Sequence, residues 1–393
     1  QAVQLKATWD EKSNCWRLNG VKRFITNGDA DIKLVLARSE EGTNDGRGLS
    51  YFVYDRKHKA VTIRRIENKL GIKGSPTGEL VFNNAPAQLV GDRKLGLIKY
   101  VMSLMNGARL GVGAQSVGLS EAAYREAFKY AQEREQFGKP IHNFAGVYEM
   151  LANMRAKTDA IRSLLYETAR NIDIYKAIED KAKYGSITPE EKQKLKKYQK
   201  IADILTPMLK LFSSEYANQI TYDAIQVHGG SGFMKDYAVE RMYRDARILT
   251  IYEGTSQLQV VAAIRGVING GYIELIKGYE AKEAKPEFST MKKVLCQMRQ
   301  RFEEALTRAN SFGSNSEFYD FNSRRLVEMC GYLIMGHLLV IDANKNPMFT
   351  NSAELMIRMG QSKIEEAASF IMNFEEAAIA KYKVAGDCKA CQE

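Results

Sequence analysis

Hydrophobic and polar positions follow two different periods along this chain. Up to about residue 95, apolar residues come in short runs separated by Gly, Asp, Asn or Pro, which is typical of β-strands. The Asn19-Gly20 dipeptide predicts a tight turn joining two strands, at 16–20 and 21–28. Several short strands at this spacing predict a β-barrel or sandwich. The further strands are expected at 32–37, 49–54, 61–66 and 78–82.

From about residue 97 the apolar residues recur at threes and fours, which is typical of helices. Three helices long enough for an antiparallel bundle are expected, at 97–131, 144–174 and 201–227. The stretch at 175–200 is rich in Lys and Glu, and Thr188-Pro189 within it is a good helix start with Thr as the cap. It therefore predicts a solvated helical extension.

A polar stretch, 278–286, precedes a last helical block at 287–393. In that block, 331–341 is apolar enough for a buried helix and 344–347 reads as a turn. The predicted fold class is therefore α+β with several domains. They are an N-terminal β-barrel or sandwich domain at 1–95, an antiparallel four-helix bundle at 96–277 with an insertion near 175–200, and an additional C-terminal helical domain at 278–393.

Composition narrows the class of protein. The 393 residues are 45% hydrophobic, as in a globular protein, and no apolar stretch approaches the roughly 20 residues that cross a bilayer. We therefore expect no membrane span and a cytoplasmic location. The five scattered cysteines argue against a disulfide framework. Cys388 and Cys391 lack further ligands nearby, so a frayed tail is expected there and no metal site.

The net charge of +10 fits phosphate-bearing ligands, nucleic acid or simple solubility. Its basic residues are spread along the chain and mixed with acids, with no arginine-rich arm and no zinc-finger spacing. We expect no nucleic-acid partner.

One carboxylate occupies an unusual position. Glu253 lies between Tyr252 and Gly254, at a break in helical sequence within the run 243–257, YRDARILTIYEGTSQ. A carboxylate at such a break is expected to point in a fixed direction, towards a site, rather than to be an ordinary solvated surface group. The run closely resembles the active-site segment of the flavin-dependent acyl-CoA dehydrogenases, in which the corresponding glutamate removes the proton next to a thioester carbonyl.

The resemblance extends in the family's order from residue 1 to 268, through the segments 22–28, 69–77, 134–138 and 226–232. It implies FAD as the cofactor. In the family, the turn that corresponds to 134–138 and the glycine segment at 226–232 reach the FAD of a neighbouring subunit, so a homodimer or homotetramer is expected. A guanidinium suits a pyrophosphate as a planar fork of donors. The implied cofactor-binding residues are Phe24, Ile25, Thr26, Arg134, Gln136, Phe137, Gln226, Gly229, Gly230, Thr255 and Gln257.

Taken alone, two of these segments have plainer explanations. Residues 22–28 are by themselves a hairpin, and the glycines at 229–230 are by themselves a helix C-cap. The segment at 69–77 is commonly structural in the family.

The resemblance also assigns the catalytic and substrate-binding residues. A minority of the family place the base on the first long bundle helix, but here that position is alanine, in Asn106-Gly107-Ala108-Arg109. Glu253 is therefore the expected base, with Gly254 beside it and Arg109 ordering the pocket. Tyr252 and Arg265 are the implied substrate contacts, Arg265 lying about three turns of helix beyond the base and suited to the nucleotide end of CoA.

The implied reaction is α,β-dehydrogenation of an acyl-CoA to the trans-2-enoyl-CoA. In the family, a backbone N–H and a flavin ribityl hydroxyl hold the thioester carbonyl, FAD N5 accepts the β-hydride, and electrons pass to an electron-transfer flavoprotein. Two alternatives stay open: an acyl-CoA oxidase that uses dioxygen, and a flavin-free helical assembly module.

The chain also departs from the family. The tail and the 175–200 stretch resemble a longer bacterial subgroup, which does not fix the acyl group. The family's N-terminal helical domain has no counterpart here, so this chain alone is not expected to turn over substrate.

Overall fold

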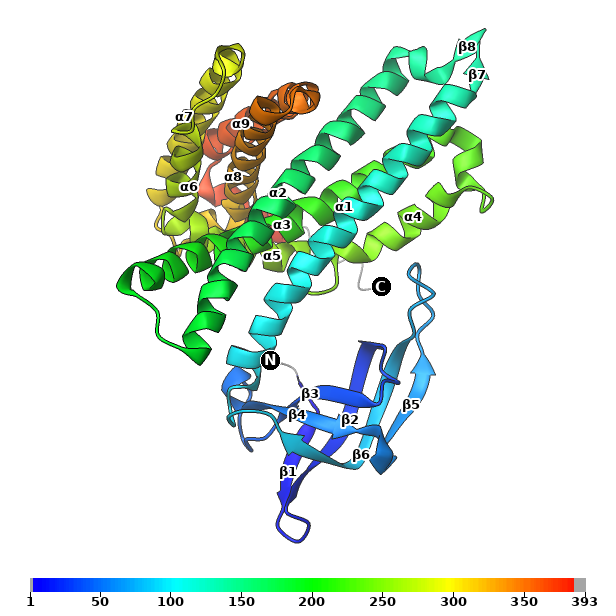
Figure 1. Cartoon of the computed structure of the whole chain (residues 1–393), viewed down its shortest axis with the longest axis vertical. Helices are drawn as coiled ribbons and strands as arrows, with labels where there is room; N and C mark the ends of the chain where they lie inside the picture. Colours follow the sequence, from blue (N-terminus) through cyan, green and yellow to red (C-terminus); the bar gives the residue numbers. More distant parts are fainter. Residues whose placement is uncertain (1–2, 385–393) are drawn as a thin grey trace. The chain divides into compact units, whose positions relative to one another are not determined.

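The computed structural model describes residues 3–384, and the chain divides into two compact units, Gln1–Ala108 and Arg109–Glu393. The first unit is built on a sheet and the second on helices, so the predicted α+β class is confirmed (Figure 1). The division into three domains stays a prediction. Cys388 and Cys391 lie outside the described residues.

The first unit is a small barrel. Its strands lie in the order β2-β1-β3-β4-β6-β5, and a further pairing of β2 with β6 closes the ring. One edge of β6 pairs with β2, while the other edge pairs first with β5 and then, at its end, with β4. The strands are β1 (Lys6–Asp10), β2 (Cys15–Thr26), β3 (Ile32–Arg38), β4 (Leu49–Asp55), β5 (Val61–Ile66) and β6 (Thr77–Leu89).

Alternate residues of these strands form the core of the barrel. Val35 and Ala37 on β3 are buried, as are Phe52 and Tyr54 on β4, while the residues between them are more exposed. Side chains two residues apart lie on the same face of a strand, so one face of β3 and one face of β4 point inward. The period-2 pattern in the sequence thus corresponds to the inside of a barrel.

The predicted turn at Asn19-Gly20 is wrong. Residues 15–26 form one long strand, β2, and the register against β6 shifts between Leu18 and Gly20. Gly20 has a φ of 131°, and the Asn19 side chain accepts a hydrogen bond from the Asn84 N–H at 2.7 Å. The dipeptide therefore makes a bulge inside a strand, where a positive φ and a side-chain acceptor serve equally well. The hairpin forms one strand earlier, between β2 and the unpredicted β1.

The second unit holds the long helices that the periodicity predicts (Figure 1). A small two-stranded hairpin joins the first two, and a short loop joins the second to the third, so consecutive long helices run antiparallel. The elements are α1 (Met102–Glu133, which begins in the first unit), β7 (Glu135–Gln136), β8 (Lys139–Pro140), α2 (Ala145–Tyr184), α3 (Pro189–His228), α4 (Ala238–Ala246), α5 (Ser256–Ile268), α6 (Gly271–Glu280), α7 (Ser289–Asn310), α8 (Glu317–Lys345), α9 (Thr350–Asn373) and α10 (Ile379–Val384).

The helix start at Thr188 is confirmed. The Thr188 hydroxyl accepts a hydrogen bond from the Glu191 N–H at 3.2 Å, and the Glu191 carboxylate accepts one from the Thr188 N–H at 2.9 Å. Pro189 occupies the first helical position. This reciprocal capping box lets α3 begin far from the core, in exposed sequence.

The apolar segment 331–341 lies within α8, as predicted, and is buried. Of the helices in residues 3–384, α8 alone is long and apolar enough, judged by length and composition, to cross a membrane. In the structure 78% of its most apolar window is buried inside the unit, which is the pattern of a core helix.

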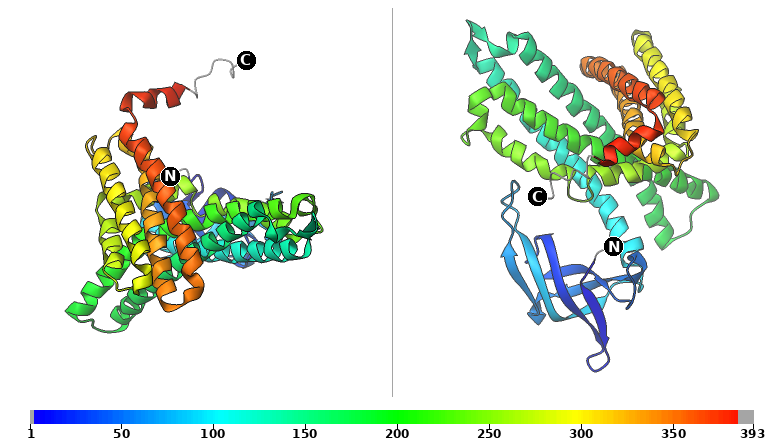
Figure 2. Two further views of the ribbon diagram at one scale, coloured as in Figure 1. Left: turned by 90° about the horizontal axis from the view of Figure 1, so that it is seen from above. Right: turned by 180° about the vertical axis from the view of Figure 1, so that it is seen from behind.

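Helices α7, α8 and α9 lie side by side (Figure 2) and share one hydrophobic core with α2, α3 and α5. α8 approaches α3 closely, because a Cβ on Gly331 would come within 2.0 Å of the Phe212 ring. A buried hydrogen bond of 2.8 Å from the Ser352 hydroxyl to Asp159 ties α9 to α2. The last helical block is therefore packed on the same core as α2, α3 and α5.

Candidate functional site

Glu253 lies on a short irregular loop between the 3-10 turn that follows α4 and the start of α5. Its φ is 54° and that of Gly254 is 98°, so two consecutive residues adopt left-handed backbone. For a residue with a side chain this conformation is disfavoured by about 1–2 kcal/mol, and it persists only where surrounding contacts fix it.

Three side chains from three helices supply those contacts. Lys210 on α3 donates to the Gly254 carbonyl at 2.7 Å, and Gln259 on α5 donates to the same oxygen at 2.9 Å. Arg109 on α1 makes a longer contact, from its Nε to the Glu253 carbonyl at 3.4 Å. The loop is thus held through its main chain, and the half-buried Glu253 side chain is not needed for that support.

Two of the three supports are buried cations. Arg109 is 9% exposed and Lys210 is fully buried. Burial, followed by the nearby charge of Arg109, lowers the pKa of Lys210 to about 8, while the carboxylates of Glu215 and Glu253 oppose the change. Burial also lowers the pKa of Arg109, again opposed by Glu253. Two positive side chains, Arg109 and Lys210, are therefore buried behind the loop.

The other predicted residues of this segment divide into two groups. The Tyr252 hydroxyl donates to Gln115 on α1, and burial followed by the charge of Glu253 raises its pKa. Thr255 caps α5, accepting from the Leu258 N–H at 3.4 Å. By contrast, Gln257 and Arg265 point into solvent along α5. The structure brings Tyr252, Gly254, Thr255 and Arg109 to Glu253, and places Arg265 farther along the helix.

A second group of predicted residues surrounds the β7–β8 hairpin between α1 and α2. Arg134, Gln136 and Phe137 are all exposed there, Phe137 by 93%. Phe137 and Gly138 have φ values of 50° and 79°, which is the backbone of a tight two-residue hairpin turn. The segment thus projects a guanidinium and an aromatic ring outward from the bundle.

An aromatic stack places the glycine segment beside this hairpin. The ring of Tyr130, one turn of α1 before Arg134, stacks on His228 with centroids 4.3 Å apart. The Tyr130 hydroxyl also reaches Ser231 at 3.2 Å. Gly229 and Gly230, next to His228, are exposed, and a Cβ on either would meet nothing within 4 Å. Gly229 also ends α3, with its N–H bonded to the Gln226 carbonyl, so the plainer C-cap function is present as well.

The two groups lie at opposite ends of one helix. The stretch of α1 from Arg109 to Glu133 is roughly 36 Å long, at about 1.5 Å of rise per residue. One chain therefore does not bring the Arg134 group and Glu253 to a single small site.

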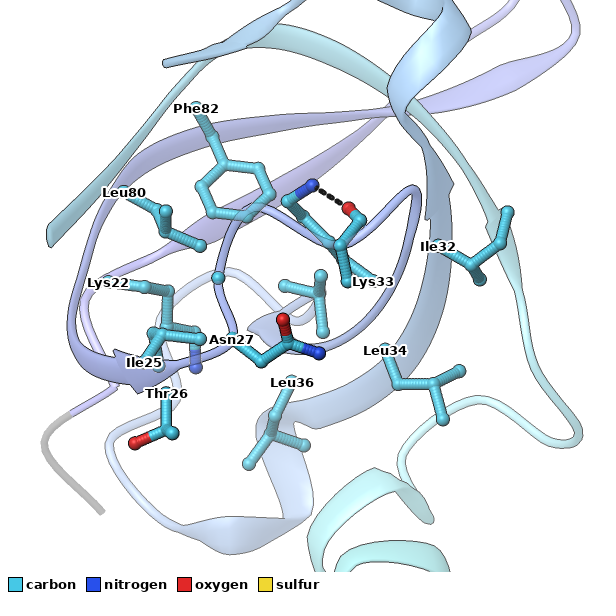
Figure 3. Close-up of a pocket in the computed structure, with 13 residues that line it drawn as sticks. Lys22, Ile25, Thr26, Asn27, Ile32, Lys33, Leu34, Leu36, Leu80 and Phe82 are labelled. Atoms are coloured by element: carbon cyan, nitrogen blue, oxygen red, sulfur yellow. Dashed lines mark hydrogen bonds between the residues drawn. The ribbon is translucent and has the colours of Figure 1, made fainter. Parts of the chain in front are cut away.

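In the barrel, the segment 22–28 meets the segment 69–77. The Asn27 N–H donates to the Pro76 carbonyl at 2.8 Å, and the hydroxyls of Thr26 and Thr77 lie 3.2 Å apart. Ile25 and Thr26 line a cavity of about 290 Å³ together with residues of β3 and β6 (Figure 3). Phe24 lies outside that lining and is 67% exposed, with a φ of 60°. The two family-like segments of the barrel are thus in contact in the fold.

Sequence reasoning missed Lys210, Gln259 and Gln115. Lys210 carries a readable signal, because it is a lone charge in the apolar run Met208-Leu209-Lys210-Leu211-Phe212. Gln259 and Gln115 are polar residues on helices and give no such signal. Within residues 3–384 there is no group of three or more His, Cys, Asp or Glu side chains that could hold a metal ion.

Three family models match the chain in sequence order. The model described as "Acyl-CoA dehydrogenase, middle domain" matches residues 1–85, and "Acyl-CoA dehydrogenase, C-terminal domain" matches 98–186 and 190–268. The model "Acyl-CoA dehydrogenase C terminal" matches 268–379, which includes α7, α8 and α9.

Two curated relatives are named as reductases. The acryloyl-CoA reductase (NADH) of Anaerotignum propionicum is 38% identical over 270 residues, covering 68% of this chain and 62% of that protein. The caffeyl-CoA reductase-Etf complex subunit CarC of Acetobacterium woodii is 34% identical over 259 residues, covering 65% of this chain and 62% of that protein. The chain thus spans about three-fifths of the length of these relatives.

A solved structure extends the likeness to the whole chain. An acyl-CoA dehydrogenase from Bacillus anthracis, complexed with FAD, covers 98% of this chain with a TM-score of 0.78 and 24% identity, and 68% of that protein is matched. At this identity the likeness concerns the fold, and it includes the last helical block. With barrel, bundle and last helices each matched by a model of the same family, the chain belongs to the acyl-CoA dehydrogenase family.

Proposed function

We propose that this chain carries the base of an FAD-dependent α,β-dehydrogenation that converts an acyl-CoA thioester to a trans-2-enoyl-CoA. The observation that carries the proposal is the held loop at Glu253. Its carboxylate is half-exposed on strained backbone, while both neighbouring carbonyl oxygens are taken by buried side chains. Strained backbone of this kind concentrates at functional sites.

In this proposal, Glu253 takes the α-proton of the thioester. A carboxylate is a weak base, so that proton must be made more acidic by hydrogen bonds to the thioester carbonyl. A main-chain N–H of the held loop supplies one such bond, since Lys210 and Gln259 already fix the peptide plane through the Gly254 carbonyl. Arg109 and Lys210 hold the main chain on which this carboxylate stands.

The donor groups of the chain fit FAD. Arg134 offers an exposed planar fork of donors, and the side-chain-free surface at Gly229 and Gly230 allows a diphosphate to approach the main chain. Gln136 and Gln226 add exposed amides. When bound, FAD supplies the acceptor for the hydride that leaves the β-carbon. Thr26 and Ile25 in the barrel, with Thr255 and Gln257 at α5, are the proposed flavin contacts.

The separation along α1 supports a shared cofactor site. Because Arg134 and Glu253 lie at opposite ends of that helix, the Arg134 group would serve the FAD of a second subunit. A homodimer or homotetramer is therefore the proposed assembly. An electron-transfer flavoprotein is the proposed electron partner, and the relative CarC, named as a subunit of an Etf complex, supports it.

The relatives favour a second candidate, the reverse reaction. Both curated relatives above are named as reductases of CoA esters, acryloyl-CoA in one and caffeyl-CoA in the other. The same residues would then work in the opposite sense, with protonated Glu253 delivering a proton to the α-carbon of an enoyl-CoA. Tyr252 and Arg265 remain the proposed substrate contacts in either direction.

Because this chain alone is not expected to turn over substrate, the test uses the complete enzyme: an anaerobic visible spectrum of the FAD-loaded protein, titrated with acyl-CoA esters of different length. Glu253→Gln should keep FAD and ester binding but slow flavin bleaching by roughly 10²–10⁴-fold, as expected when a general base is removed. Glu274→Gln, an exposed glutamate on α6, is the matched control and should bleach at the wild-type rate. Enoyl-CoA added to the reduced protein measures the reverse direction in the same cell.

Each outcome has a defined meaning. Near-normal bleaching in Glu253→Gln removes Glu253 as the base. A wild-type protein that binds FAD but is bleached by no ester contradicts the proposed reaction. Rapid reoxidation of the bleached flavin by dioxygen, without an electron-transfer flavoprotein, favours the oxidase alternative.

A further inference from the structure

Lys210 is a fully buried cation in the middle of α3. Its neighbours in sequence, Leu209 and Leu211, are buried apolar residues. A buried ammonium is costly unless it is paired and hydrogen-bonded. The group within hydrogen-bond distance of its amine in the described residues is a main-chain oxygen, the Gly254 carbonyl at 2.7 Å.

That oxygen belongs to the residue directly after Glu253. Gly254 is the second of two successive left-handed residues, and its carbonyl lies just before the start of α5. The same carbonyl also accepts from Gln259 at 2.9 Å. Two donors on one carbonyl, from two different helices, fix the plane of the Gly254–Thr255 peptide.

We propose that Lys210 is a positioning residue, whose buried ammonium locks the Gly254–Thr255 peptide and thereby directs the Glu253 carboxylate. The inference rests on the function proposed above for Glu253. Lys210 acts through the main chain and touches no substrate.

A charged donor suits this task better than a neutral one. Hydrogen bonds from an ionised donor are roughly twice as strong as neutral ones. Without Lys210, the Gly254 carbonyl would still accept a hydrogen bond from Gln259. That side chain belongs to the first turn of α5, which directly follows the loop, so it would not tie the loop to another helix. The strained backbone at Glu253 would then be free to relax, and the carboxylate would lose its direction.

The buried position of Lys210 also makes its hydrogen bond to the Gly254 carbonyl sensitive to alkaline pH. Burial brings the pKa of its amine down to about 8. The charged groups that face it are Arg109 from α1, Glu215 on its own helix and Glu253 on the loop. Above that pKa the amine is neutral, the bond to Gly254 weakens, and proton abstraction should slow.

The experiment compares Lys210→Met, which removes donor and charge, with Lys210→Gln, which keeps a donor that does not titrate. Lys157→Met is the matched control, because Lys157 is a half-buried lysine on α2 that faces Asp223 rather than the loop. Two quantities are measured on the complete enzyme. One is amide hydrogen exchange at Leu258 and Gln259, whose N–H groups bond to Thr255.

The other quantity is the anaerobic rate of flavin bleaching between pH 6 and 10. Lys210→Met should bleach about 100-fold more slowly at saturating ester with little change in KM, the cost of a misplaced catalytic group. Its exchange at the two amides should be on the order of 10-fold faster. Lys210→Gln should bleach at an intermediate rate and lose the alkaline decline seen in the wild type. Lys157→Met should keep both the decline and the amide protection.

The outcomes separate this inference from the proposed function. If no ester bleaches the flavin of the wild-type protein, the proposed function is contradicted. The exchange data then still test whether Lys210 fixes the Gly254–Thr255 peptide. If Lys210→Gln bleaches at the wild-type rate and keeps the same alkaline decline, the positioning role is overturned. Amide exchange at Leu258 and Gln259 that is as slow in both variants as in the wild type also overturns the positioning role. If Lys210→Met does not fold, Lys210→Gln alone still provides this exchange test.

Discussion

Acid should destabilise the helical unit through one histidine. His337 lies in the middle of α8, is 2% exposed, and its Nε2 has no hydrogen-bond partner among the described residues. Burial, followed by the charges of Lys292 and Arg299, lowers its pKa to about 4 from an ordinary 6.5. Glu280 lies 3.9 Å from Nε2, but its carboxylate is already held by Arg299 at 2.8 Å.

The sign follows from proton binding. Between pH 6.5 and 4 the unfolded chain binds a proton at His337 that the folded chain refuses, so the stability contributed by the neutral ring is present above pH 6.5 and is lost as the pH falls. With those two pKa values, the free energy of unfolding should be about 2 kcal/mol lower at pH 5 than at pH 7 from this group. That corresponds to roughly 3 °C in melting temperature for a unit that spans residues 109–393.

The assay is thermal unfolding followed by helical circular dichroism, at pH values from 7.5 to 5. His337→Gln carries no titrating group there, so its melting temperature should fall less over this range than that of the wild type. His58→Gln is the control, because His58 is exposed in the barrel and should leave the wild-type profile unchanged. Parallel profiles for wild type and His337→Gln would refute the reasoning, since they would mean that the ring can be protonated without cost.

Three shorter predictions concern other sites. Gly331→Ala should destabilise the protein by about 2 kcal/mol in chemical denaturation, because its Cβ would overlap the Phe212 ring, while Gly118→Ala, in open space on α1, should stabilise it by about 1 kcal/mol. Arg134→Ala should lose FAD more readily on gel filtration than the wild type, and equal flavin content would remove Arg134 from the cofactor site. Gly254→Ala should slow flavin bleaching by about 100-fold, since its φ is 98° and its Cβ would lie 2.7 Å from the Gln259 amide; a wild-type rate would show that the loop geometry is not needed.

Periodicity in the sequence was enough for most of the secondary structure. The strand at 61–66 and the start of α3 at Thr188 both lie where the pattern puts them. The error at Asn19-Gly20 has a physical cause, since Asn-Gly is suited to any position that needs a positive φ. Whether that position is a turn or a bulge depends on pairing with β6, a contact between residues distant in sequence.

The site divides in the same way. Glu253 could be found because a local pattern, an acid between an aromatic residue and a glycine, marks a break in helix. The supports of its loop come from α1, α3 and α5, and no local pattern reports that Arg109, Lys210 and Gln259 converge on two carbonyl oxygens. Convergence of this kind is a property of helix packing, which only the folded chain displays.

The length of α1 between its two groups has a genetic consequence. With the cofactor shared between subunits as proposed, each chain gives its base to one site and its Arg134 hairpin to another. A chain defective in Glu253 and a chain defective in Arg134 should then rescue each other when they are expressed together, because a mixed assembly contains a site built entirely from intact parts. Two defects within one chain should show no such complementation, so an assembly of this protein would behave genetically as a set of separable half-sites.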